Sequence, residues 1–290
     1  MSNGSPNPDR ATVSGNHGTD GGGGFPTARS VSTTITIDGV EVDSDNTEKP
    51  FEKIEMITIN EVTNKSNINL DTGERSQVDF IETTKYTFEH NRMAVEVELE
   101  AVNDFFIGWY MGLQLIRNGW RTDAYFNHDL VKTGLYTQTL DILESGTKEE
   151  SPNMHRVTMR NNKGDTIHVE TDKDYGMGYT KIRNDDPVCY LRENYQKFYF
   201  HLVKNYNNLI VLKGEKVKYR GAYIFGKNKA KNATNVTYFT ENGIKKAYVD
   251  FKVIATENIE YTSVEESFNC TFGSNSVTST EPNAYAKLII

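Results

Sequence analysis

Residues 92–114 read RMAVEVELEAVNDFFIGWYMGLQ and carry two strand patterns in succession. From Met93 to Ala101, apolar residues alternate with an alanine and three glutamates, which predicts a strand with one apolar face and one acidic, solvated face. From Phe105 to Leu113 the chain is apolar and aromatic, interrupted by Gly108 and Gly112. Such a run is typical of one strand buried on both faces. Together the two patterns predict a layered β fold.

The rest of the chain repeats these patterns in short runs. They lie at residues 31–37, 54–62, 78–88, 157–160, 166–170, 198–203, 209–212, 216–219, 222–225, 236–240 and 247–254. Turn signals such as Asp38-Gly39 and Glu89-His90-Asn91 separate neighbouring runs. About a dozen short strands without a long helical period predict an all-β fold of the β-sandwich or jelly-roll type.

The domain organisation follows from where apolar residues are missing. Residues 1–30 are rich in Gly, Ser and Asn, so we expect a disordered arm: a purification scar, a linker, or an attachment segment. Residues 31–290 are expected to form the β-sandwich. The polar stretch at 43–50 leaves two possibilities open, a small separate β segment at 31–85 before a main sandwich at 86–290, or one continuous set of sheets.

Composition excludes several classes of partner. The net charge of −8 argues against nucleic acid, and no apolar run approaches the ~18 residues that span a bilayer, so no membrane partner is expected. The N-terminus lacks a basic start followed by an apolar stretch, so we expect no signal peptide and folding in a reducing cytoplasm. Cys189 and Cys270 are expected to be separate buried thiols, with one long-range disulfide as the alternative.

The densest cluster of aromatic residues, at 109–126, suggests a sugar-binding patch. An exposed Trp or Tyr ring gives a sugar an apolar platform, and neighbouring amides and charged groups bind its hydroxyls. Trp120 follows the turn signal Asn118-Gly119 and is therefore expected at the surface, whereas the favoured interpretation of Trp109 is a core residue. The candidate ligand-binding residues are Trp120, Arg121, Tyr125, Asn127 and Trp109.

The same region offers oxygen ligands for a cation. Asp123 and Asp129, with Asn127 and His128 between them, could hold Ca²⁺, which many sugar-binding β-sandwiches carry. No Asp-x-Asp-x-Asp-Gly loop accompanies them. The alternative is a polar loop without a metal, and our expectation is that the protein needs no cofactor.

Three histidines are the catalytic candidates. A lyase acting on acidic sugars could use His128, His168 or His201 as the base, while Arg121 neutralises the carboxylate of the sugar. The alternative is that each histidine is structural. Glu96, Glu98 and Glu100 share one strand face and could supply a glycosidase carboxylate, although such a row is more typical of a solvated face.

A resemblance to a known family covers roughly residues 85–255. The runs at 198–203, 209–217 and 219–225, with Tyr110-Met111-Gly112-Leu113-Gln114, resemble the closing β-sandwich module of phage tail and receptor-binding proteins. The resemblance implies a virion component that is assembled in the host cytoplasm and binds a cell-surface glycan, commonly as a trimer. It also implies that residues 1–30 tether the protein to other virion proteins. No catalytic residues of the family map onto this chain.

Three functions therefore remain open. The first is a phage appendage protein that binds a cell-surface polysaccharide without acting on it. The second is a jelly-roll polysaccharide lyase or hydrolase. The third is a purely structural virion or decoration protein. The sequence favours the first.

Overall fold

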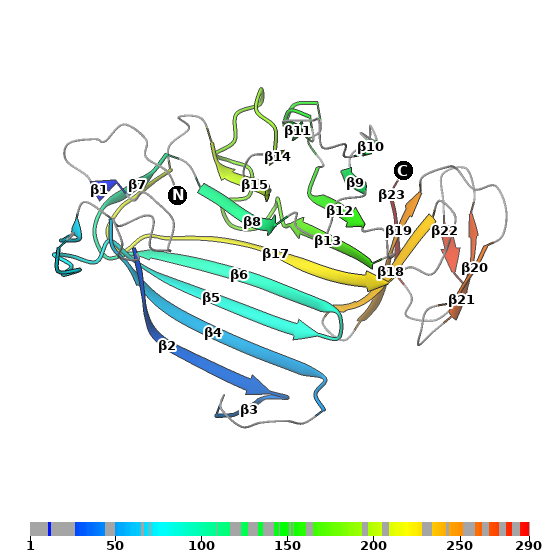
Figure 1. Cartoon of the computed structure of the whole chain (residues 1–290), viewed down its shortest axis with the longest axis horizontal. Coiled ribbons are helices and arrows are strands. Elements are labelled where there is room, and N and C mark those ends of the chain that lie inside the picture. Colours follow the sequence, from blue (N-terminus) through cyan, green and yellow to red (C-terminus); the bar gives the residue numbers. More distant parts are fainter. Residues whose placement is uncertain are drawn as a thin grey trace.

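Strands make up nearly all of the regular structure in the computed structural model (Figure 1). The structure describes residues 11–12, 27–43, 50–64, 67–69, 71–108, 110–116, 123–126, 133–135, 142–144, 146–150, 152, 154–160, 165–192, 197–204, 209–227, 234–241, 244–251, 259–262, 267–272, 277–279 and 285–289. The all-β prediction is confirmed. None of the helical structure within these ranges is long and apolar enough to cross a membrane.

The largest sheet has ten antiparallel strands, in the order β10-β9-β12-β13-β17-β6-β5-β4-β2-β3. The strands are β2 (Ala28–Ile37), β3 (Val40–Glu41), β4 (Lys53–Val62), β5 (Phe80–Glu89), β6 (Arg92–Ala101), β9 (Asp123–Phe126), β10 (Thr133–Leu135), β12 (Arg156–Arg160), β13 (Asp165–Thr171) and β17 (Lys216–Lys227). Residues of the 31–85 segment therefore share this sheet with β6 and β17.

Tight turns join neighbouring strands of this main sheet as the sequence indicates. Ile37 pairs with Val40, so Asp38 and Gly39 form a two-residue turn in which both φ angles are positive, 51° and 81°. This is the conformation that such hairpins require. His90, with φ 49°, occupies the corresponding turn between β5 and β6. Both turn predictions are confirmed.

The alternation along β6 sorts the main sheet into two faces. We call the face that carries Val95, Val97 and Leu99 the inner face, because these side chains are at most 6% exposed. The opposite, outer face carries Glu96, Glu98 and Glu100. Register pairing extends the two faces across β4, β5 and β17, since residues paired across antiparallel strands point to the same side.

A smaller sheet lies over the inner face. It has four strands in the order β11-β14-β15-β8 and covers the part of the main sheet near β13 and β17 (Figure 1). Its strands are β8 (Tyr110–Ile116), β11 (Ile142–Glu144), β14 (Cys189–Arg192) and β15 (Lys197–Val203). The core lies between the two sheets and includes Phe198, Phe200 and Leu202 from β15, each at most 1% exposed.

The apolar run at 105–113 is not one strand, and this prediction is wrong. β7 (Phe105–Ile107) pairs with β1 (Ala11–Thr12) and β16 (Leu209–Val211) in a separate three-stranded sheet, whereas β8 pairs with β15. Both halves are buried, so the run has the composition of a buried strand throughout. Hydrophobicity alone does not reveal that the chain changes sheets.

For β17 the sequence predicts two strands, at 216–219 and 222–225. The structure has a single strand that is twelve residues long. Gly221 in its middle interrupts the apolar pattern but not the strand. A Cβ atom there would lie 2.2 Å from the backbone oxygen of Glu170 and 2.4 Å from Leu113 Cδ1. Gly221 therefore allows β8 to pack closely against β17.

Two further sheets are formed by the last part of the chain. One has the order β18-β19-β23 and contains the predicted hairpin, in which Glu241 pairs with Ile244. The other has the order β20-β21-β22. Their strands are β18 (Thr234–Glu241), β19 (Ile244–Phe251), β20 (Ile259–Thr262), β21 (Ser267–Phe272), β22 (Val277–Ser279) and β23 (Tyr285–Ile289).

Candidate functional site

A groove opens where the four-stranded sheet stops short of covering the main sheet. β8 pairs only with β15 among the strands described, so it forms the border of the smaller sheet above the inner face of β17, β6 and β5. The groove has a volume of about 410 Å³, within the range of small-molecule sites. Its lining residues are Glu82, Thr84, Tyr86, Met93, Val95, Val97, Tyr110, Met111, Gly112, Leu113, Gln114, Tyr219 and Tyr223.

Tyrosines dominate the polar lining of this groove. Tyr110 and Tyr219 pack edge to face, with ring centroids 5.6 Å apart and planes at 83°, and their hydroxyl oxygens lie 3.4 Å apart. They are 5% and 8% exposed, so they form the buried wall. Tyr86 and Tyr223 are more exposed and lie on the same inner face. The groove thus offers both aromatic surface and hydroxyl groups.

The four phenols stay protonated at neutral pH. Burial is the first cause that raises the pKa of Tyr86, Tyr110, Tyr219 and Tyr223 above the usual value of 10. The nearby Glu82 carboxylate raises the pKa of Tyr86, Tyr110 and Tyr219 further. A neutral phenol both donates and accepts hydrogen bonds, so the groove has bifunctional groups.

Glu82 is the one carboxylate among the described lining residues. It is 7% exposed and lies on the inner face of β5, paired with Leu99. Asn60 on β4 donates a hydrogen bond to its Oε1 over 3.4 Å. A carboxylate has about four acceptor positions, so Glu82 can accept further hydrogen bonds from a hydroxyl-bearing ligand.

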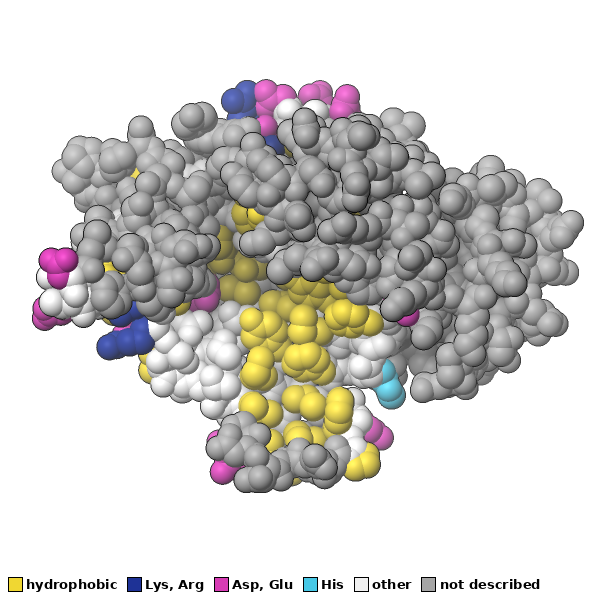
Figure 2. Space-filling model, viewed as in Figure 1, with side chains coloured by type: hydrophobic (Ala, Val, Ile, Leu, Met, Phe, Trp, Pro, Cys, Tyr) yellow, Lys and Arg dark blue, Asp and Glu magenta, His cyan; other side chains and the backbone are white. Residues whose placement is uncertain are grey.

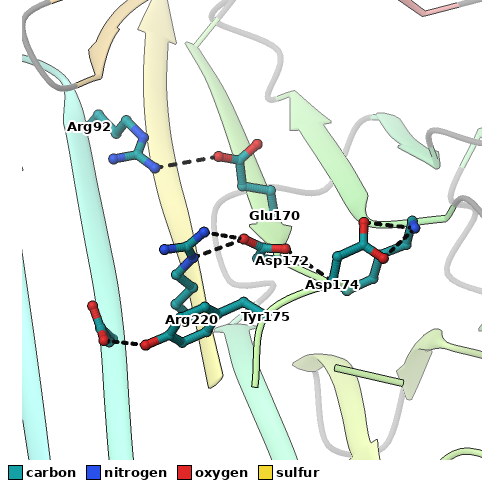
Figure 3. Close-up of polar contacts among 8 residues, drawn as sticks. Arg92, Glu170, Asp172, Asp174, Tyr175 and Arg220 are labelled. Atoms are coloured by element: carbon teal, nitrogen blue, oxygen red, sulfur yellow. Dashed lines mark hydrogen bonds and ion pairs between the residues drawn. The ribbon is translucent and has the colours of Figure 1, made fainter. Parts of the chain in front are cut away.

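Basic side chains of the same strands lie on the outer face instead. Arg92 on β6 is 3.8 Å from Glu170, and Arg220 on β17 donates to Asp172 over 2.7 and 2.8 Å (Figure 3). The Arg220 guanidinium also stacks 4.1 Å from the ring centre of Tyr175, whose hydroxyl donates to Glu96 (Figure 3). Lys216 binds Glu98 and Glu100. The row of Glu96, Glu98 and Glu100 is therefore a solvated face whose carboxylates bind neighbouring side chains. This is the alternative to a glycosidase carboxylate that the sequence favoured.

An apolar surface continues from the groove over the uncovered strands. Figure 2 shows hydrophobic side chains extending from beneath the upper part of the molecule across the region of β6, β5 and β4. Ile54, Met56 and Phe88 belong to this inner face and are partly exposed. The groove is therefore the polar end of a longer apolar surface.

The two candidate histidines that the structure describes, His168 and His201, do not line the groove. His168 is fully buried, and its Nδ1 lies 2.7 Å from Thr158 Oγ1. His201 is also fully buried, with Nδ1 3.0 Å from the carbonyl oxygen of Pro187. Burial and the Lys204 charge lower the pKa of His201 to about 3, so it is neutral in the folded protein at neutral pH. Both histidines are parts of the core, and His128 lies outside the described residues.

The predicted aromatic patch falls largely outside the described residues. Tyr125 and Asp123 lie in β9, which β12 and β13 separate from β17, so their backbone is away from the groove. Their side chains are not described. Trp109, Trp120, Arg121, Asn127 and Asp129 lie outside the ranges given above.

The calcium hypothesis stays a prediction for the same reason. Where side chains are described, no group of three His, Cys, Asp or Glu residues is placed to hold a metal ion. Cys189 is buried, which raises the pKa of its thiol well above the usual value, while the side chain of Cys270 is outside the described set.

Sequence reasoning missed most residues of the groove. Tyr110 and Gln114 fall in the aromatic cluster at 109–126, whereas Tyr219 and Tyr223 fall in a run that was quoted for the family resemblance and not for a site. One signal was present for the others. The alternation that makes Val95 and Val97 inward-facing also places Glu82 and Tyr86 on one face of β5, and Tyr219 and Tyr223 on one face of β17.

Comparisons with known proteins give distant structural similarity only. No protein family and no curated protein matches the sequence. A GH36 α-galactosidase from Geobacillus stearothermophilus, solved with stachyose, is similar with a TM-score of 0.42 and 8% identity, over 69% of this chain and 28% of that one. The Slr1438 protein from Synechocystis has a TM-score of 0.31 and 8% identity, over 63% and 65%. The function is therefore argued below from the residues of the groove.

Proposed function

We propose that this protein binds carbohydrate in the groove between β8 and the inner face of β5, β6 and β17. The observation that carries the proposal is that four tyrosines and one largely buried carboxylate, Glu82, line the same open groove.

The chemistry of a sugar fits this lining. A pyranose ring has an apolar C–H face that packs on an aromatic ring, and Tyr86 and Tyr223 present partly exposed rings. Its hydroxyls both donate and accept, as phenols do, and Glu82 can accept from a further hydroxyl. Apolar groups such as Met93 and Val95 complete a floor on which the ring can rest.

Binding is favoured over catalysis by the charged groups that the groove supplies. A glycosidase usually needs two carboxyl groups about 5 to 9.5 Å apart, and the described lining contributes Glu82 alone. A lyase acting on acidic sugars needs a cation to neutralise the sugar carboxylate. The basic residues of these strands bind acids on the outer face instead.

A glycan array with the full-length protein, followed by titration of the strongest ligand, tests the proposal. Tyr86→Ala should weaken binding about tenfold or more, because it removes a partly exposed aromatic ring from the lining of the groove. Tyr175→Ala removes a tyrosine from the outer face and serves as the matched control, with no expected change. Binding that survives Tyr86→Ala but is lost in Trp120→Ala would move the site to the predicted patch at 109–127.

The biological setting of this binding stays a proposal of its own. A phage appendage protein, trimeric and attached through residues 1–30, is what the resemblance over residues 85–255 implies. Analytical ultracentrifugation of the full chain tests the trimer, and loss of virion incorporation on deleting residues 1–26 tests the tether.

A further inference from the structure

We infer that Met93 and Met111 form a modification site at which hydrogen peroxide oxidises the folded protein, and that their oxidation weakens ligand binding in the groove. The modification site itself rests on the burial and placement of the methionines. Its consequence for binding rests on the proposed function and adds a way to regulate it.

Three of the seven methionines are parts of the core. Met154, Met159 and Met177 belong to the packed cluster between the sheets and are 0%, 1% and 7% exposed. Oxidation of a methionine depends on access of the oxidant to its sulfur. These three thioethers are therefore shielded as long as the protein stays folded.

The other methionines that the structure describes gather at the groove. Met56, Met93 and Met111 are partly exposed. Met93 on β6 and Met111 on β8 line the groove from the two facing sheets. Met56 on β4 lies on the inner face next to them but outside the lining. Solvent thus reaches the described methionine sulfurs at one surface of the molecule, and two of them belong to the candidate site.

Met93 lies between two aromatic residues of the inner face. It pairs in register with Phe88 on β5 and with Tyr223 on β17. Side chains at directly paired positions lie close enough to touch, and a thioether packs favourably beside an aromatic ring. A chemical change at Met93 therefore acts within the aromatic lining of the groove and not at its periphery.

The reaction with peroxide needs no other group of the protein. A sulfur lone pair attacks one oxygen of hydrogen peroxide, and the O–O bond breaks to release hydroxide. The hydroxide takes the proton of the new S–OH group and leaves as water, while the other oxygen stays on sulfur as the sulfoxide. Sulfur loses two electrons and the peroxide gains them.

The sulfoxide changes what the groove offers to a sugar. It converts a flexible apolar side chain into a polar one and adds an oxygen atom to it. The C–H face of a sugar then loses part of the apolar floor, and water bound to the sulfoxide must be removed before the ring can rest there. Both effects weaken binding, whereas the fold persists because these side chains already reach solvent.

Peptide mapping by mass spectrometry tests the modification site. The folded, full-length protein is treated with hydrogen peroxide at neutral pH for increasing times, quenched and digested. Met93 and Met111 should form sulfoxide about tenfold faster or more than the core residues Met154 and Met159. Equal rates in the two groups would overturn the inference.

The glycan array named above serves as the binding probe. The array signal of the wild type is compared before and after peroxide treatment on those glycans whose signal depends on Tyr86. Treatment should lower this signal about fivefold or more, and methionine sulfoxide reductases A and B should restore it. Restoration assigns the loss to methionine, because these enzymes reduce no other oxidised side chain.

Two variants assign the loss to the groove. The double variant Met93→Leu, Met111→Leu removes both sulfurs at nearly constant side-chain volume, so peroxide should change its signal less than about twofold. Met56→Leu makes the same change at a partly exposed methionine outside the lining and is the matched control, which should lose signal as the wild type does. Each protein is compared with itself before treatment, and far-UV circular dichroism checks that each is folded.

The outcomes separate the two proposals. A wild-type signal that peroxide leaves unchanged, or a loss that persists in the double variant, overturns the inference but leaves carbohydrate binding intact. If no array glycan depends on Tyr86, the proposed function fails. The inferred regulation then fails with it, even where the mass spectra place the sulfoxides at Met93 and Met111.

Discussion

The hydroxyl of Tyr223 on β17 joins the two sheets at the backbone of Gln114 on β8. It accepts a hydrogen bond from the Gln114 N–H over 3.1 Å and donates to the Gln114 carbonyl oxygen over 2.7 Å. Both backbone groups lie on the side of β8 away from β15, where strand pairing ends. One side chain thus takes the place of a neighbouring strand and fixes the height of β8 above the groove.

Tyr223→Phe should therefore lower stability and loosen the groove at the same time. Losing both hydrogen bonds should cost about 1–2 kcal/mol of unfolding free energy, because two backbone groups lose their partner. Urea denaturation followed by tyrosine fluorescence measures the change. Tyr86→Phe removes a hydroxyl from the same groove but not from this clamp, so it should cost less. Equal costs for the two variants would contradict the role given to Tyr223.

Gly221 on β17 and Gly112 on β8 should differ sharply in their tolerance of a methyl group. In Gly221→Ala the new Cβ would meet the backbone oxygen of Glu170 at 2.2 Å, and backbone cannot move away cheaply. In Gly112→Ala it would meet Cδ1 and Cγ of Leu202 at 3.0 Å, and a side chain can shift by a few tenths of an ångström more cheaply than backbone can. We expect the free energy of unfolding to fall by about 3 kcal/mol or more in Gly221→Ala, and by less than about 1.5 kcal/mol in Gly112→Ala. Thermal unfolding of both variants gives the comparison, and the reverse order would be evidence against the close packing at Gly221.

The sequence predicted the fold more completely than it predicted the groove. Alternation over 93–101 and the turn at Asp38-Gly39 are local patterns, and each predicts a local structure that the protein has. The groove depends instead on which strand lies over which. Tyr110 meets Tyr219 and Gln114 meets Tyr223, each across 109 residues of sequence. No short-range pattern specifies such a contact.

The histidines show a second limit of sequence reasoning. His168 alternates with Ile167 and Val169 and does face the opposite side of β13, as its position predicts. His168 is nevertheless fully buried, because both faces of β13 are covered, which agrees with the alternative of a structural histidine. Alternation reports the side to which a residue points, and only the packing of other elements decides whether solvent reaches it.

The groove tyrosines should bind ligand unchanged up to pH 10. Burial raises the pKa of Tyr86 and Tyr223 above 10, so both remain neutral donors where an ordinary tyrosine begins to ionise. Affinity for an uncharged sugar bound in the groove should therefore stay constant from pH 7 to 10. These tyrosines also contribute to folding stability, because their pKa is higher in the folded than in the unfolded protein. This contribution is complete below pH 10 and is lost as the pH rises beyond it. Calorimetric titration across this range checks the first point, and a fall in affinity centred below pH 10 would contradict it.

His201 should make the protein sensitive to acid. Its folded-state pKa of about 3 lies below the usual 6.5, so the unfolded chain binds a proton more readily between these values. Its contribution to stability is complete above pH 6.5 and is lost as pH falls toward 3, by about 1.4 kcal/mol per pH unit within this window. The Lys204 ammonium, which lies 3.6 Å from Asp186, opposes a second positive charge on His201.

His201→Asn isolates this contribution from that of the carboxylates. Asparagine keeps a donor for the Pro187 carbonyl but cannot ionise, so stability between pH 4 and 6 should fall less steeply than in the wild type. His90→Asn replaces an exposed histidine in a turn where asparagine tolerates the positive φ, and it should retain the wild-type slope. Urea denaturation at pH 4, 5, 6 and 7 measures both slopes. An unchanged slope in His201→Asn would show that His201 accepts a proton without unfolding the protein.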